Sequence, residues 1–183
     1  MPIIIILVII AVIIIGFISI YNSLVTLKNQ VANSEGQINT QLQRRFDLIP
    51  NLVETVKGYM NHEEAVLTNI AELRTSWAKA SSIEEKSNLD NQLSGALKTI
   101  MAVSENYPDL KANQNFLELQ EQLQNTEDRL AASRQIYNNT ATTYNTKLET
   151  FPSNVIASMF HFTKVNLFEV DSEEAKKNVK VQF

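Results

Sequence analysis

The sequence predicts an all-α protein in which a single N-terminal transmembrane helix continues into an elongated, antiparallel four-helix bundle. Three observations indicate this fold. The first 21 residues are almost entirely apolar, and Gly and Pro number only four each among 183 residues. Apolar side chains also recur at three- and four-residue intervals through most of the remaining chain. A chain with so few turn-forming residues favours long helices over many short strands.

Residues 2–21 form the predicted membrane anchor. The run from Ile3 to Ile18 is unbroken and rich in Ile and Val, and about 20 apolar residues are needed for a helix to cross a bilayer. A cleaved signal peptide is the alternative. However, no Lys or Arg precedes the run and no small-x-small cleavage site follows it. We therefore expect a retained, single-pass anchor whose partner is the lipid bilayer.

The basic residues predict the orientation of this anchor. No basic side chain precedes the span, whereas Lys28, Arg44 and Arg45 follow it. Because positively charged flanks tend to stay in the cytoplasm, we expect the N-terminus outside and the C-terminal domain in the cytoplasm.

The helix that follows the anchor carries a line of apolar residues with a seven-residue period, which is typical of a helix packed lengthwise on its neighbours. Arg45 is the one charged residue on this line, and only Gly36 interrupts the helical pattern before Ile49. We therefore expect the anchor to continue into the soluble helix without a flexible linker. The apolar members of the line are Leu24, Val31, Ile38, Leu52 and Tyr59.

Pro50 lies inside this pattern. It has no N–H to donate to the carbonyl of Phe46, and its ring crowds the preceding turn. The apolar line stays in phase across Pro50, so we favour one kinked helix. The alternative is a turn at residues 47–51, with Pro50 at the start of a second helix.

Three further helices are expected. Residues 58–61 break the first helix, and a helix from about residue 62 to residue 80 follows. Ser82 and Glu85 form a capping box that starts the next helix, which ends at Tyr107-Pro108. Asn113 caps a last helix that extends to Glu149 and stops before Pro152. Its apolar line has a seven-residue period and comprises Phe116, Leu123, Leu130, Tyr137, Tyr144 and Phe151.

These elements predict three domains: the anchor (1–21), the antiparallel helical bundle (22–151) and an aromatic-rich C-terminal tail (152–183). In the tail, residues 153–162 are expected to form a short amphipathic helix, and the alternating Val179, Val181 and Phe183 an extended segment. The aromatic rings of the tail either cap the open end of the bundle or lie at the lipid interface. Capping requires no further assumption, so we favour it.

Several functional classes are disfavoured. The net charge is −4 without a basic stripe, so we expect no nucleic-acid partner. The absence of Cys excludes disulfides and thiolate metal sites. His62 and His161 both lack the second ligand of a zincin or a di-iron motif. Neither a glycine-rich phosphate loop nor a nucleophile elbow is present. We therefore expect no catalytic activity, no cofactor and no metal.

One set of charged residues and a proline remains as a candidate structural or partner-binding site. It could bind an anion or a partner helix, or it could form an ion network between helices that sets the register of the bundle. We favour the ion network, because structural ion pairs are commoner than binding sites. The set comprises Arg44, Arg45, Asp47, Pro50, Glu54, Glu127, Arg129 and Arg134.

The sequence resembles the LemA family over nearly its whole length. The most specific match is the run DLIPNLVETVKGY from Asp47 to Tyr59. Others are YPDLKAN from Tyr107 to Asn113, and the pairs Tyr137-Asn138, Tyr144-Asn145 and Phe151-Pro152, with Val181-Gln182-Phe183 at the end. The resemblance implies a bacterial single-pass protein of the plasma (inner) membrane with a mostly antiparallel helical domain. It implies no established enzymatic activity and no catalytic residues.

The sequence therefore predicts a membrane-anchored helical scaffold or interaction protein that forms homo-oligomers. One alternative is an accessory subunit that binds a membrane protease or transporter through the Pro50 region or the aromatic tail. Another alternative is a helical bundle that binds a metal or a ligand.

Overall fold

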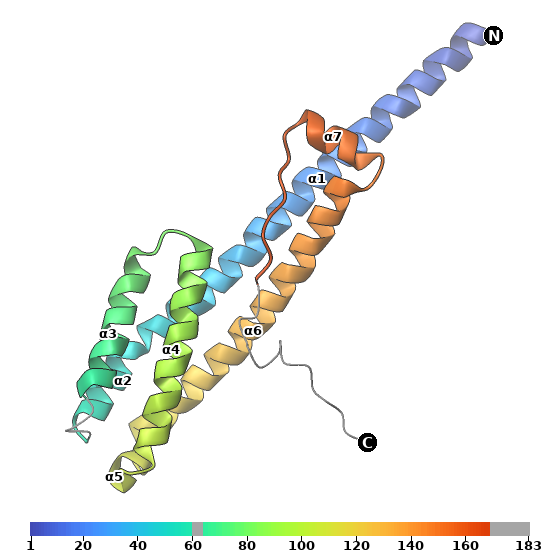
Figure 1. Ribbon diagram of the computed structural model, residues 1–183. Coiled ribbons are helices and arrows are strands. Elements are labelled where there is room, and N and C mark those ends of the chain that lie inside the picture. The colour runs from blue at the N-terminus through green and yellow to red at the C-terminus, as the bar shows by residue number, and fades with distance from the viewer. Residues whose placement is uncertain (60–63, 169–183) are drawn as a thin grey trace, which may run out of the picture. The chain divides into compact units, whose positions relative to one another are not determined.

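A computed structural model describes residues 1–59 and 64–168 of the chain (Figure 1). Within these residues the regular secondary structure is helical and no strand occurs, which confirms the all-α prediction. The helices are α1 (Pro2–Asp47), α2 (Ile49–Lys57), α3 (Glu64–Lys79), α4 (Ile83–Ser104), α5 (Pro108–Lys111), α6 (Gln114–Glu149) and α7 (Ser153–Met159).

Helix α1 joins the apolar N-terminal run to the polar part of the chain without interruption. It is one helix from Pro2 to Asp47, which confirms that no flexible linker follows the predicted anchor. Among the described residues, one helix is long and apolar enough to cross a membrane, judged by its length and composition. This is the helix that begins at Pro2.

The helix breaks at Leu48, two residues before Pro50. Helix α1 ends at Asp47 and α2 begins at Ile49, so Pro50 lies in the first turn of α2, where its missing N–H is not needed. The N–H of Leu48 donates to the carbonyl of Arg45 at 3.3 Å. Leu48 itself keeps helical dihedral angles (φ −77°, ψ −20°). A one-residue break thus divides α1 from α2, as in the alternative interpretation, but Leu48 stays helical and the run from Pro2 to Lys57 remains otherwise continuous, as in the favoured kinked helix.

The chain forms two compact units. The central unit comprises residues 33–135, and the terminal unit comprises residues 1–32 together with residues 136–183. Helices α1 and α6 each contribute to both units. We describe the two units separately.

The described part of the central unit contains four long helical segments, which are the end of α1 with α2, then α3, α4 and the first part of α6, together with the short helix α5. Helices α3 and α4 form an antiparallel hairpin (Figure 1). The ring of Trp77 stacks on Phe46 at 4.9 Å between ring centroids. The core consists of apolar residues from all four segments, among them Phe46, Ile49, Leu52, Val56, Leu67, Ile70, Leu73, Leu93, Leu97, Ile100, Phe116 and Leu123.

The two predicted helix caps in the central unit, Ser82 and Asn113, are confirmed. The hydroxyl of Ser82 accepts a hydrogen bond from the N–H of Glu85, and the Glu85 carboxylate accepts from the N–H of Ser82. The side-chain oxygen of Asn113 accepts from the N–H of Phe116 at 3.1 Å. Such side-chain acceptors satisfy N–H groups that have no partner in the first helical turn.

The residues of the two predicted seven-residue lines are buried wherever they lie within a helix. The residue of each line that lies beyond the end of its helix is exposed. Tyr59 follows the end of α2 and is 36% exposed, and Phe151 follows the end of α6 and is 83% exposed. Helical periodicity holds only while the helix continues. The buried positions are Leu24, Val31, Ile38, Arg45 and Leu52 on the first line, and Phe116, Leu123, Leu130, Tyr137 and Tyr144 on the second.

In the terminal unit, the chain after α7 follows α6 and is held there by two asparagines. The Asn145 amide donates to the carbonyl of Val165 and accepts from its N–H, at 2.8 and 3.0 Å. Asn138 makes the same pair of bonds with Phe168, at 2.9 and 2.8 Å. We call residues 165–168 the strap.

Helix α7 lies within the short helix predicted for residues 153–162 and is three residues shorter at its C-terminal end. The extended segment predicted near Val181 and the residue His62 lie outside the described residues.

Candidate functional site

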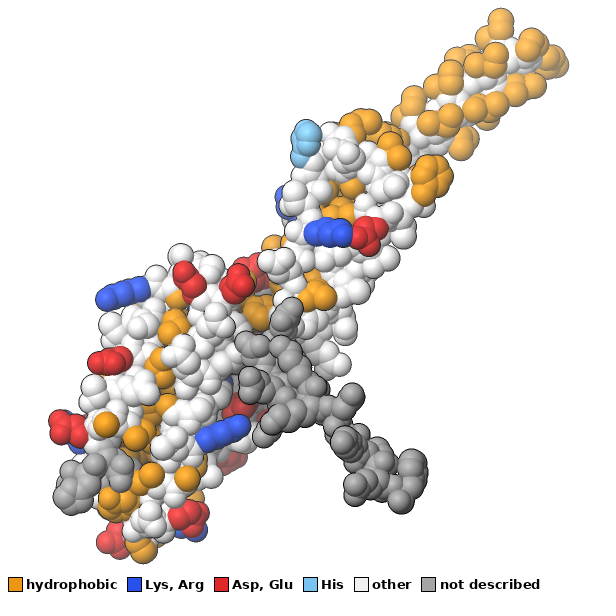
Figure 2. Space-filling model, viewed as in Figure 1, with side chains coloured by type: hydrophobic (Ala, Val, Ile, Leu, Met, Phe, Trp, Pro, Cys, Tyr) orange, Lys and Arg blue, Asp and Glu red, His pale blue; other side chains and the backbone are white. Residues whose placement is uncertain are grey.

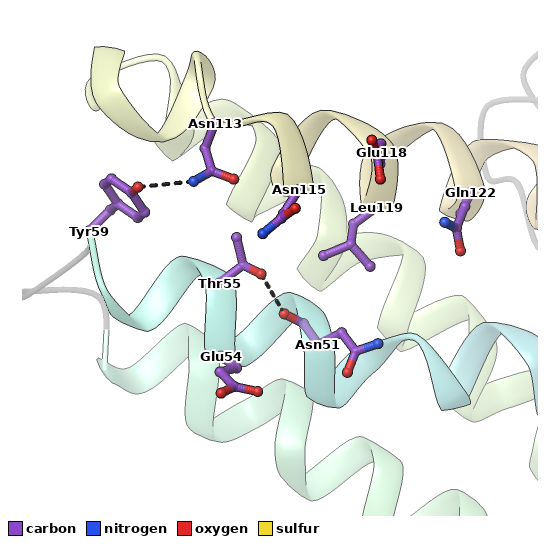
Figure 3. Close-up of a pocket in the computed structure, with 9 residues that line it drawn as sticks. All are labelled: Asn51, Glu54, Thr55, Tyr59, Asn113, Asn115, Glu118, Leu119 and Gln122. Carbon is purple, nitrogen blue, oxygen red and sulfur yellow. Dashed lines mark hydrogen bonds between the residues drawn. The ribbon is translucent and has the colours of Figure 1, made fainter.

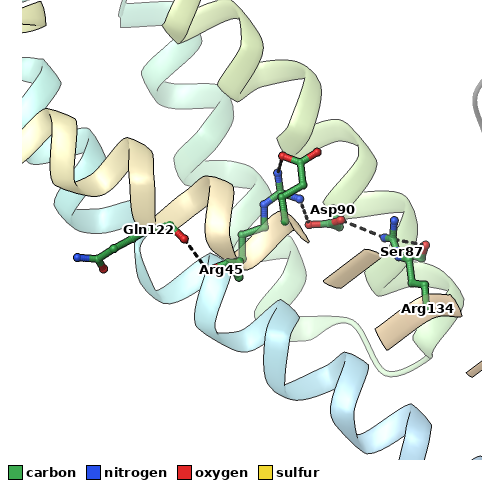
Figure 4. Close-up of polar contacts among 7 residues, drawn as sticks. Arg45, Ser87, Asp90, Gln122 and Arg134 are labelled. Carbon is green, nitrogen blue, oxygen red and sulfur yellow. Dashed lines mark hydrogen bonds and ion pairs between the residues drawn. The ribbon is translucent and has the colours of Figure 1, made fainter. Parts of the chain in front are cut away.

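Arg45 is the centre of a charged cluster in the central unit (Figure 4). It belongs to the last turn of α1 and is 1% exposed. Its Nη1 donates to Oδ1 of Asp90 at 2.7 Å, and its Nη2 donates to Oε2 of Glu127 at 3.2 Å. The guanidinium therefore connects α1 to α4 and α6.

Asp90 on α4 accepts from two arginines at once. Its Oδ2 accepts from Nη2 of Arg134 on α6 at 3.0 Å, while Oδ1 is occupied by Arg45. Asp90 is 1% exposed. Burial raises the pKa of its carboxyl above the ordinary value, and the guanidiniums of Arg45 and Arg134 oppose that shift. The two cations thus offset part of the cost of burying this carboxylate, and the pKa stays raised.

The rim of the cluster is more polar and more open. The Nη2 of Arg134 also lies 3.5 Å from the hydroxyl of Ser87 (Figure 4). The side chain of Glu127 is 48% exposed, so its ion pair with Arg45 is screened by water and weaker than the Arg45–Asp90 pair. The four charged members, Arg45, Asp90, Glu127 and Arg134, sum to zero net charge. The arginines point their donors at carboxylates, which favours the ion network over an anion site.

Asp90 and Ser87 were not among the residues predicted from the sequence. A signal for Asp90 was present, because Asp90, Leu97 and Ser104 lie seven residues apart and all three are buried. Asp90 is thus the lone charge on a buried line of α4, as Arg45 is on the line of α1. The apolar positions of α4 alone do not mark it.

The other predicted site residues lie outside the cluster. Arg44 and Asp47 are exposed at the end of α1, where Asp47 accepts a hydrogen bond from Gln43 at 2.8 Å. Pro50 is exposed in the first turn of α2, and Arg129 is exposed on α6. The structure thus brings together Arg45, Glu127 and Arg134 of the predicted set.

Glu54, the remaining predicted residue, lines a polar groove between α2 and the start of α6 (Figure 3). The groove has a volume of about 530 Å³. Two carboxylates, those of Glu54 and Glu118, line the groove. Asn113 and Tyr59 also line it, and the Asn113 amide donates a hydrogen bond of 2.9 Å to the Tyr59 hydroxyl. The other lining residues are Asn51, Thr55, Asn115, Leu119 and Gln122. This chemistry suits polar or cationic groups rather than apolar ones.

Within the described residues, no three His, Asp or Glu side chains are grouped so that they could hold a metal ion. His161 is exposed and follows α7 with a positive φ of 56°.

Comparison with known proteins decides the family. The model of the LemA family matches residues 34–183. Protein LemA of Metamycoplasma hominis is 30% identical over 158 residues, which cover 84% of this chain and 70% of that protein. The chain belongs to the LemA family.

The LemA-family chain is also similar to magnetosome proteins. Magnetosome protein MamQ 2 of Paramagnetospirillum magneticum is 26% identical over 175 residues. Magnetosome protein MamQ of Magnetospirillum gryphiswaldense is 25% identical over 174 residues. Each match covers 81% of the LemA-family chain but only 64% of the MamQ protein, so the chain spans less than two thirds of these relatives.

The structure gives local roles to three of the matches by which the sequence resembles the LemA family, one run and two residue pairs. The run from Asp47 to Tyr59 forms the break at Leu48 and helix α2. The pairs Tyr137-Asn138 and Tyr144-Asn145 place buried tyrosines beside the two asparagines that bind the strap. The hydroxyl of Tyr137 adds a bond of 2.9 Å to the carbonyl of Asn166.

Proposed function

We propose that this LemA-family chain is a membrane-anchored helical scaffold that self-associates and presents its helical surfaces to other proteins, without catalytic activity. The observation that carries the proposal is the exposure of the first turns of α1. The large apolar side chains from Ile3 to Ile15 are between 47% and 71% exposed. Exposed apolar surface costs about 25 cal/mol per Å² in water, so such a row of side chains needs an apolar surrounding. A bilayer is that surrounding, and residues 2–21 have the length to span it.

The proposed location is the bacterial plasma (inner) membrane, with a single pass. The first Lys or Arg of the chain is Lys28, which supports an external N-terminus and a cytoplasmic C-terminal domain. The chain has no Cys, so single cysteines can report the topology. A cysteine at exposed Thr75 should react with a membrane-impermeant maleimide only after the cells are permeabilised. Labelling of intact cells would reverse the proposed orientation.

Anchoring is tested by placing charges in the span. The variant Ile6→Lys/Ile10→Lys should lose membrane association, because a Lys at the centre of a span costs about 2.5–3.5 kcal/mol. The matched control, Gln120→Lys/Gln124→Lys, adds the same charge to exposed positions of α6. The native chain and the control should stay with membranes after alkaline washing. If the native chain is released by that wash, the anchor is disproved.

Self-association is supported by the outer face of α6 in the central unit. This face is rich in amides that can pair across helices without adding charge. Its exposed amides are Gln114, Asn115, Gln120, Gln122, Gln124, Asn125 and Gln135. A single cysteine at Gln124 should form bis-maleimide dimers in native membranes, whereas one at Thr75 on α3 should form few. A strictly monomeric mass of the detergent-solubilised protein by light scattering would rule out self-association.

The polar groove supports a second candidate function, that of an accessory subunit for a membrane protease or transporter. The groove is open and contains Glu54 and Glu118, so a segment bearing Lys or Arg is the expected occupant. Crosslinking from a cysteine at Glu54 in native membranes, followed by mass spectrometry, separates the two functions. One abundant foreign protein at this position would favour the accessory subunit, and crosslinks to other copies of the chain would favour the scaffold.

A further inference from the structure

Helix α7 of the terminal unit carries apolar side chains on two opposite faces. Ile156 and Ala157 are buried, at 5% and 3% exposure. Val155 and Met159, one turn apart, are 56% and 57% exposed, and Phe151 just before the helix is 83% exposed. A helix at a water-facing surface normally has polar side chains on its outer face. The outer face of α7 is therefore more apolar than water would favour, although it also includes the exposed Ser158.

Charged residues are absent from this part of the sequence. No Asp, Glu, Lys or Arg occurs between Glu149 and Lys164. The same is true of α1 from Pro2 to Leu27, and the next residue is Lys28. The terminal unit thus contains two uncharged segments, each followed by a lysine.

Aromatic contacts place the end of α7 beside the end of the predicted anchor. The ring of Phe160 lies 4.7 Å from the ring of Tyr21 and 6.0 Å from the ring of Phe17, between centroids. The Phe162 ring lies 6.1 Å from that of Tyr21, and Nζ of Lys28 lies 5.8 Å from the Phe162 ring. Because residues 2–21 cover about 30 Å as a helix, these contacts lie where the hydrocarbon of a bilayer would end.

We propose that α7 is a second membrane contact, which lies in the lipid interface beside the anchor. We call its surface the interfacial patch and define it as Phe151, Val155, Met159 and Phe160. Short apolar segments with aromatic residues bind at the boundary between headgroups and acyl chains. Lys28 would then lie level with the headgroups, where lysines extend their ammonium groups into water or toward anionic lipids. Lys164 would lie at the same level in its ion pair with Glu149.

The lipid surface is preferred over a protein partner because the patch continues an apolar surface that already needs lipid. Figure 2 shows apolar side chains over α7 and along the N-terminal part of α1, within the same unit. The inference rests on the proposed anchoring of residues 2–21, and it goes beyond it by giving α7 its own contact with the bilayer. For Phe151 and Phe160 it takes the lipid interface, the second of the two placements that the sequence allows for the aromatic rings of the tail.

Depth-dependent quenching tests the inference, because the chain has no natural Cys. Single cysteines at Val155, Met159, Ile10 and Thr142 are labelled with an environment-sensitive fluorophore. The full-length proteins are reconstituted into vesicles of phosphatidylcholine and phosphatidylglycerol. Thr142 is an exposed residue of α6 in the same unit and serves as the aqueous control, and Ile10 reports the anchor.

Labels at Val155 and Met159 should lose most of their emission to lipids brominated on the acyl chain and be protected from iodide. The label at Thr142 should show the opposite. If the Ile10 label is quenched by bromolipid while those at Val155 and Met159 respond only to iodide, the interfacial patch is wrong and the anchor stands. If Ile10 is also quenched only by iodide, the anchor itself is wrong. Protection of Val155 and Met159 from both quenchers would indicate a protein contact and would equally overturn the inference.

Discussion

Arg45 and Asp90, 45 residues apart in the sequence, form a buried ion pair with 2.7 Å between Nη1 and Oδ1. Both residues are 1% exposed. A buried pair of this kind contributes little net stability, because desolvation of the two charges cancels most of their attraction. Its effect is on specificity: a shift of α1 by one turn against α4 would break the pair and leave Asp90 with Arg134 alone and Arg45 with the half-exposed Glu127. We therefore interpret the pair as the contact that sets the register of these helices.

Loss of Arg45 should strongly destabilise the central unit. Arg45→Ala leaves Asp90 buried beside a single arginine, and breaking a buried pair costs about 3–5 kcal/mol. Arg44→Ala, at the exposed neighbouring position, should change the stability by no more than about 0.5 kcal/mol. Urea unfolding followed by the fluorescence of Trp77, the single tryptophan of the chain, measures both. Equal effects of the two substitutions would contradict the assigned burial of Arg45.

The two carboxylates that contact Arg45 should differ in importance. Asp90→Ala leaves two guanidiniums without their shared buried partner, with an expected cost of about 3–5 kcal/mol. Glu127→Ala removes a half-exposed partner and should cost at most about 1 kcal/mol. The same urea titration compares them, and a larger loss for Glu127→Ala would place the centre of the network on α6 rather than α4.

A residue of this charged cluster can be predicted from the sequence when it interrupts a line of apolar residues with a seven-residue period. Arg45 could be found because it is a single charge on an otherwise apolar seven-residue line. Asp90 obeys the same rule, yet its line on α4 is marked by Leu97 and Ser104 only and is easily read as a solvated face. Helix starts at Ser82 and Asn113 were predictable because a cap depends on residues within one turn.

Other features could not be predicted because they depend on competition between alternatives or on distant contacts. Pro50 removes one backbone hydrogen bond whether the helix bends or breaks. The sequence therefore does not decide between a bend and a break at Leu48. Tyr59 and Phe151 fit the seven-residue spacing in the sequence. Both residues lie beyond the ends of their helices, however, and their side chains are exposed. Asn138 binds backbone 30 residues away, a contact between side chain and main chain that leaves no periodic pattern.

The capping box should give the stability of α4 a characteristic pH dependence. Hydrogen bonds from the N–H groups of Ser81 and Ser82 lower the pKa of Glu85 from its ordinary value of 4.5. Because the folded pKa is the lower one, the stability from this carboxylate is fully present above the unfolded pKa. It is lost as the pH falls from there through the folded pKa.

Glu85→Gln should therefore flatten the decline of stability with falling pH in this acidic range. Glu84→Gln, at the exposed neighbouring position in the first turn of α4, is the matched control and should leave the decline intact. Thermal unfolding by circular dichroism as a function of pH measures the three proteins. An unchanged pH profile for Glu85→Gln would show that the capping carboxylate is not linked to folding.

The strap should loosen at Phe168 when Asn138 loses its amide. Seven residues of helix rise about 10.5 Å, and three residues of extended chain span about 10 Å. The spacing from Asn138 to Asn145 therefore matches that from Phe168 to Val165, and each amide can pair with one backbone residue. Asn138→Asp keeps the acceptor for the Phe168 N–H but turns a second oxygen toward the Phe168 carbonyl. We expect a local loss of about 1–3 kcal/mol, the cost of an unsatisfied and repelled polar group.

Hydrogen exchange of the Phe168 amide measures this loss directly, because local opening sets the exchange rate in a segment held by few contacts. The rate should rise about tenfold or more in Asn138→Asp. It should stay unchanged in Asn139→Asp, whose side chain is on the exposed face of α6. Exchange at Val165 should rise less, because Asn145 still holds that residue at 2.8 and 3.0 Å. Equal exchange in the native chain and in Asn138→Asp would mean that the strap is held by the ring contact of Phe168 with Tyr137, at 5.0 Å, rather than by the amide pair.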